Sequence, residues 1–133
     1  MTDGEFLAAL ESCTLPESEF GHVGHVRAGW LYLRANDFAG ALSQMSTALR
    51  RYAAAHGKPD RYHETITVAY LALINEHRYR YGDGGDWPAF IGQNEALLDR
   101  RLLCHYYRPE TLASPEARRV FILGEFRNPP HGS

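Results

Sequence analysis

The chain has 133 residues, of which 44% are hydrophobic and 23% are charged, as expected for one globular domain with a single core. Its formal net charge of −2 at pH 7 excludes the strongly basic surface of a nucleic-acid-binding protein. No apolar run is long enough for a membrane span, and the acidic residues Asp3, Glu5 and Glu11 are atypical of a signal peptide. Cys13 and Cys104 form no CxxC pair, which favours reduced thiols and a cytoplasmic location.

The spacing of apolar residues predicts four helices in the first part of the chain, at about 2–12, 19–35, 38–56 and 61–79. Thr2 and Glu5 have the spacing of a capping box at the start of the first helix. Ser18, Asp37 and Asp60 are the expected N-caps of the next three.

Residues 81–86 contain three glycines and are predicted to form a loop. A short helix is expected after Asp86, a longer one over about 94–107, and a last one from Ser114-Pro115-Glu116. No segment alternates polar and apolar residues over the length of a strand. The sequence therefore predicts an all-α fold, a single-domain helical bundle of about six helices over residues 1–127, followed by an irregular tail at 128–133.

The segment from Trp30 to Leu42, continued to Ala48-Leu49, resembles one helical hairpin of the tetratricopeptide repeat family. It has small residues and an aromatic around a short polar turn. The pattern occurs once, whereas a solenoid needs several copies, so we interpret it as a convergent helix pair.

A wider pattern, His22-x-x-His25-x-x-x-Gly29-Trp30 followed by Tyr62-His63-Glu64-Thr65, resembles a set of small uncharacterised bacterial proteins that are all helical. The resemblance implies an all-helical fold. It implies no activity, so the functional hypotheses must come from the residues themselves.

Three histidines in these two segments are candidate ligands of a metal ion. His22 and His25 lie three residues apart, about one helical turn, and share the face expected to point inward. His63, on a neighbouring helix, would be the third ligand and would leave a position open for water or substrate. The expected cofactor is one divalent transition metal, and the sequence does not choose between zinc, iron and copper. Buried neutral histidines that only donate hydrogen bonds are the alternative.

Other polar residues could complete such a site. Glu64 follows His63 as the general base follows the first histidine of HExxH proteases, but Thr67 stands where the second histidine would be. Glu64 could be a base, a fourth ligand or a surface charge. Glu19 competes with it as the carboxylate ligand, and Tyr70 is a candidate proton carrier beside the pocket-lining Thr67.

Two hypotheses of different classes follow. In the first, the protein is a small helical metalloprotein, an enzyme that acts on a small molecule through metal-bound water or dioxygen chemistry. In the second, it is a non-catalytic interaction module built on the hairpin at 30–50, and its histidines are structural. The first requires the three histidines to converge beside a pocket; the second requires an exposed groove. A homodimer is compatible with both.

Overall fold

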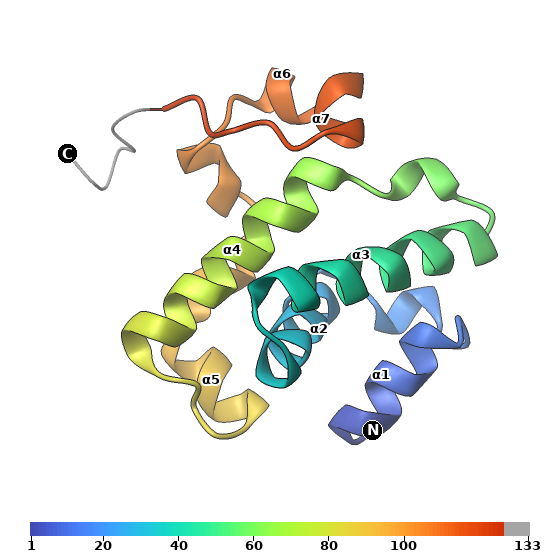
Figure 1. Cartoon of the computed structure of the whole chain (residues 1–133), viewed down its shortest axis with the longest axis vertical. Helices are drawn as coiled ribbons and strands as arrows, with labels where there is room; N and C mark the ends of the chain where they lie inside the picture. Colours follow the sequence, from blue (N-terminus) through green and yellow to red (C-terminus); the bar gives the residue numbers. More distant parts are fainter. Residues whose placement is uncertain (127–133) are drawn as a thin grey trace.

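The computed structural model describes residues 1–126, and every regular element in that range is helical (Figure 1). Its α-helices are α1 (Asp3–Glu11), α2 (His22–Ala35), α3 (Phe38–Ala55), α4 (Glu64–Tyr81), α5 (Trp87–Gln93), α6 (Pro109–Leu112) and α7 (Pro115–Arg119). The predicted all-α, single-domain fold is confirmed. The tail expected at 128–133 lies outside the described residues.

The three long helices α2, α3 and α4 form the centre of the bundle, and α2 contacts both of the others. Gly29 lies where α2 and α4 meet. A Cβ atom added there would stand 2.8 Å from Ile74 Cδ1 and 3.3 Å from Leu71 Cδ1. The absence of a side chain at Gly29 therefore allows these two helices to pack closely.

Several predicted helix starts are confirmed by their capping hydrogen bonds. Thr2 and Glu5 form the capping box of α1. Asp37, Asp86 and Ser114 accept hydrogen bonds from the backbone amides of α3, α5 and α7, respectively. These side chains satisfy amides that have no partner inside the helix.

Two predicted starts are wrong, and both affect the candidate residues. Residues 17–19 form a 3-10 turn, and α2 begins only at His22. Residues 59–61 form another such turn, and α4 begins at Glu64. His63, not Asp60, is the N-cap of α4, because its imidazole accepts the hydrogen bond of the Ile66 amide.

The helix expected over 94–107 is replaced by two 3-10 turns, Glu95–Leu98 and Leu102–His105. The break falls at Asp99, whose backbone is extended and whose carboxylate accepts a hydrogen bond from the Arg101 amide. Such a local side-chain bond competes with helix continuation. The leucine pattern is still satisfied, since Leu97 and Leu103 are buried on either side of the break.

The predicted glycine-rich loop is confirmed, and Asp83 anchors it to the bundle. Gly82, Gly84 and Gly85 have positive φ angles, which side chains larger than hydrogen disfavour. The Asp83 carboxylate pairs with Arg34 and Arg78, while its carbonyl accepts a hydrogen bond from the buried Trp30 indole. No helix within residues 1–126 is long and apolar enough to cross a membrane.

The contact at Gly29 leads to a stability prediction. Replacing Gly29 with Val should lower the free energy of unfolding by about 1–3 kcal/mol, because the added carbons overlap Ile74 and Leu71. Gly92→Val in α5 is the matched control, since nothing lies within 4 Å of its Cβ position. We expect the control to change stability by less than about 0.5 kcal/mol. Urea unfolding measures both, and equal effects would contradict the packing argument.

Candidate functional site

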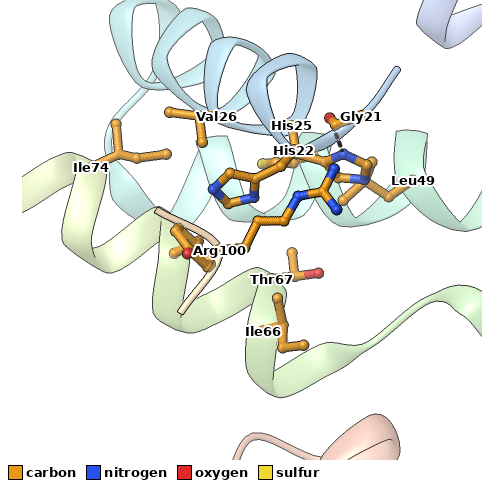
Figure 2. Close-up of a pocket in the computed structure, with 11 residues that line it drawn as sticks. Gly21, His22, His25, Val26, Leu49, Ile66, Thr67, Ile74 and Arg100 are labelled. Carbon is orange, nitrogen blue, oxygen red and sulfur yellow. Dashed lines mark hydrogen bonds between the residues drawn. The ribbon is translucent and has the colours of Figure 1, made fainter. Parts of the chain in front are cut away.

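A cavity of about 310 Å³ lies between α2, α3 and α4, and we call it the first cavity (Figure 2). It is lined by Gly21, His22, His25, Val26, Met45, Leu49, Ile66, Thr67, Tyr70, Ile74 and Arg100. Its walls are mainly apolar, and its volume falls at the lower end of small-molecule sites. Four of the residues singled out from the sequence border it: His22, His25, Thr67 and Tyr70.

His22 is the first residue of α2, and its ring is fixed from two sides. Its Nε2 donates a hydrogen bond to the Leu97 carbonyl oxygen at 3.0 Å, and its ring meets Tyr70 edge-on at 5.0 Å between centroids. A carbonyl oxygen only accepts, so Nε2 carries the proton and Nδ1 of the neutral ring has a lone pair. That Nδ1 has no hydrogen-bond partner among residues 1–126.

His25 lies one turn further along α2. Its Nδ1 donates to the Gly21 carbonyl oxygen at 2.9 Å, and its ring stacks on Phe20 with centroids 4.1 Å apart. Burial lowers the pKa of His25, and the nearby His22 adds to this effect. The imidazole is therefore neutral at neutral pH, and its Nε2 lone pair has no partner in the described part of the chain.

Within residues 1–126, Arg100 is the only lysine or arginine that lines the first cavity. It follows the break at Asp99, is exposed to solvent, and makes no hydrogen bond or ion pair within residues 1–126. Its side chain reaches across the cavity toward α2 (Figure 2). No sequence signal distinguished Arg100, because it was expected on a continuous helix with other arginines.

Tyr70 holds the segment that carries Arg100. Its hydroxyl donates a hydrogen bond to the Asp99 carbonyl oxygen at 2.8 Å. Burial raises the pKa of Tyr70 to about 12, so the hydroxyl keeps its proton at neutral pH and acts as a donor. In this arrangement Tyr70 positions the rim of the cavity.

A second cavity of about 260 Å³ adjoins the first and shares His25, Leu49, Ile66 and Thr67 with it. Its other lining residues are Glu17, Phe20, Tyr52, Ala53, His56, Lys58, Arg61, Tyr62 and His63. The buried Thr67 donates its hydroxyl hydrogen to the His63 carbonyl oxygen at 2.8 Å. His25 and Thr67 are thus the polar groups at the boundary between the two cavities.

His63 borders only the second cavity, and both of its ring nitrogens are engaged. Nδ1 accepts from the Ile66 amide at 3.1 Å, and Nε2 donates to the Leu112 carbonyl oxygen at 2.7 Å. Burial lowers the pKa of His63, and the positive charge of Arg118 lowers it further. His63 is therefore a neutral helix cap, and neither nitrogen is free for a metal in this conformation.

The two candidate carboxylates lie outside both cavities. Glu64 accepts a hydrogen bond from the Tyr62 hydroxyl at 2.6 Å and lies 3.5 Å from the Arg50 guanidinium. Glu19 belongs to the 3-10 turn before α2 and borders a separate hollow near the N-terminus. Because α2 starts only at His22, Glu19 does not continue its histidine face.

Within residues 1–126, no three histidine, cysteine, aspartate or glutamate side chains converge closely enough to hold a metal ion. His22 and His25 both line the first cavity, whereas His63 lines only the second, together with His25 and His56. Comparisons of the chain with protein-family models, curated proteins and solved structures give no match. The features that bear on function are therefore the two cavities and their polar groups.

Removing the His63 cap should destabilise the fold. His63→Ala leaves the Ile66 amide and the Leu112 carbonyl without partners, and we expect a loss of about 1–3 kcal/mol in the free energy of unfolding. His63→Asn keeps an acceptor suited to an N-cap and should recover part of the loss. Equal stability of the wild type and His63→Ala in urea unfolding would contradict this role.

The lowered pKa values of His25 and His63 predict a pH dependence of stability. As pH falls below the ordinary histidine value of 6.5, the unfolded chain binds protons before the folded one does. Stability is therefore fully present well above that value and declines as the pH falls through it toward the lowered pKa values of the folded chain. Urea unfolding across this range should show the decline, with a smaller slope in His63→Asn. An unchanged slope would assign the effect to other groups.

Proposed function

We propose that the protein binds a small molecule with an apolar body and an acidic group in the first cavity. The observation that carries this proposal is the unpaired Arg100 guanidinium beside an apolar cavity with two imidazoles. An apolar body gains free energy by leaving water, at about 25 cal/mol per Å² of buried surface. A carboxylate on the same molecule would pair with Arg100, because guanidinium and carboxylate form two parallel hydrogen bonds.

His25 gives this site a group that could take part in a reaction as well as in binding. Its neutral Nε2 lone pair can accept a proton from a bound molecule, as general bases do. His22 offers a second free nitrogen, and the protonated Tyr70 holds the Arg100 segment in place. The protein could therefore act as an enzyme on the molecule it binds, with His25 as the base. Glu64 is paired elsewhere and is not needed for this role.

Metal binding is the second candidate, and the two free imidazole nitrogens favour it. His22 Nδ1 and His25 Nε2 belong to residues that line the same cavity one turn apart. Together they would offer two ligands to zinc, iron or copper, and a carboxylate of the bound molecule could supply a third. Metal-dependent hydrolysis or dioxygen chemistry would then occur in the first cavity.

We prefer both candidates to a helical interaction module, because the hairpin at 30–50 uses its apolar residues in the core. Trp30, Tyr32 and Met45 are each less than 5% exposed. They are not available to bind another protein. The cytoplasmic location proposed from the sequence agrees with the free thiols of Cys13 and Cys104.

Arg100 provides the test of anion binding. Octanoate is a suitable probe, and we expect Arg100→Gln to bind it about two- to fivefold more weakly in calorimetric titration. Arg101→Gln is the matched control, because Arg101 is an exposed neighbour that borders neither cavity. Octanol, which lacks the charge, should bind both variants equally. An Arg100→Gln variant that binds octanoate like the wild type would refute the proposal.

Metal uptake tests the second candidate. Protein purified without an affinity tag and then incubated with Zn²⁺, Fe²⁺ or Cu²⁺ should retain about one equivalent, measured by plasma mass spectrometry. His22→Gln and His25→Gln should each lose the metal. His63→Asn should keep it, since the His63 nitrogens are already bonded to backbone. If no metal is retained by folded wild-type protein, the metal candidate fails and the anion-binding proposal is unaffected.

A further inference from the structure

The second cavity borders the same residues as one wall of the first. His25, Leu49, Ile66 and Thr67 line both cavities, so the two spaces adjoin along these residues. Apart from His25 and Thr67, the shared boundary is apolar. A molecule that occupied both cavities would have to pass His25 and Thr67.

The outer part of the second cavity carries a cluster of charged groups around Glu17. The Glu17 carboxylate lies 2.8 Å from Lys58 Nζ, 3.3 Å from Arg61 Nη1 and 3.3 Å from His56 Nδ1. Two permanent cations share this one carboxylate, so the cluster keeps a net positive charge. An additional anionic group would be attracted to it.

His56 is a further polar residue that lines the second cavity. Its Nε2 is buried and has no hydrogen-bond partner among residues 1–126. Its ring packs against Tyr52, with centroids 4.2 Å apart, and both residues line the second cavity. Nδ1 faces the Glu17 carboxylate and therefore carries a proton, so Nε2 of the neutral ring is an acceptor that a hydrogen-bond donor on a bound molecule could satisfy.

We infer that the bound molecule carries a second anionic group, which pairs with Lys58 and Arg61. This inference rests on the proposed function, in which the first acidic group pairs with Arg100. The apolar middle of the molecule would then lie against His25 and Thr67 at the boundary. The class of ligand is an elongated dicarboxylate with an apolar chain.

The test compares an α,ω-dicarboxylate series, from suberate to sebacate, with monocarboxylates of equal chain length in calorimetric titrations at low salt. The best-fitting dicarboxylate should bind about five- to tenfold more tightly than its monocarboxylate. The double variant Lys58→Gln/Arg61→Gln should lose this gain and keep its affinity for the monocarboxylate. Arg51→Gln, at an exposed site that borders neither cavity, should leave both affinities unchanged.

A variant that is expected to raise the affinity for the dicarboxylate distinguishes a binding role of the cluster from a purely structural role. Glu17→Gln removes the carboxylate that competes for Lys58 and Arg61, so it should bind the dicarboxylate more tightly than the wild type does. A cluster with only a structural role predicts no such gain. Equal affinity for both ligand types, or a gain that persists in the double variant, would overturn the inference alone. If neither ligand type binds, the proposed function falls and the inference falls with it.

Discussion

The close contact of α2 and α4 at Gly29 is the constraint on which the cavity depends. Ile74 and Leu71 fill the space that a side chain at position 29 would occupy. On the N-terminal side of this contact the facing residues include four polar ones: His22 and His25 on α2, with Thr67 and Tyr70 on α4. The first cavity lies beside these polar side chains. The packing contact and the candidate site therefore lie on the same pair of helices.

Part of this arrangement could be predicted because it follows from helical periodicity. His22 and His25 share the inner face of α2 with Gly29, and Thr67 and Tyr70 share a face of α4. Once the two faces are packed together, these four residues must meet. Four helix caps could also be predicted, because their side chains accept hydrogen bonds from amides only a few residues away: Thr2, Asp37, Asp86 and Ser114.

The rest could not be predicted, since it depends on where helices begin and break. Moving the start of α4 to Glu64 turned His63 from a residue on the helix face into its cap. The late start of α2 took Glu19 off the histidine face. Arg100 reached the cavity only because the Asp99 side chain interrupts an otherwise convincing helical pattern. In two of these cases, His63 and Asp99, a polar side chain accepts a hydrogen bond from an amide only two or three residues away.

The cavity is built from two kinds of structure with different resistance to local opening. Its floor belongs to the three long helices, whereas Arg100 at its rim lies between two short 3-10 turns, and Tyr70 ties that segment down through Asp99. Short turns open at a much lower free energy than packed helices. We therefore expect the rim to open at a lower free-energy cost than the helices when a molecule enters or leaves. The residence time of the molecule and the stability of the fold are then set by different parts of the chain.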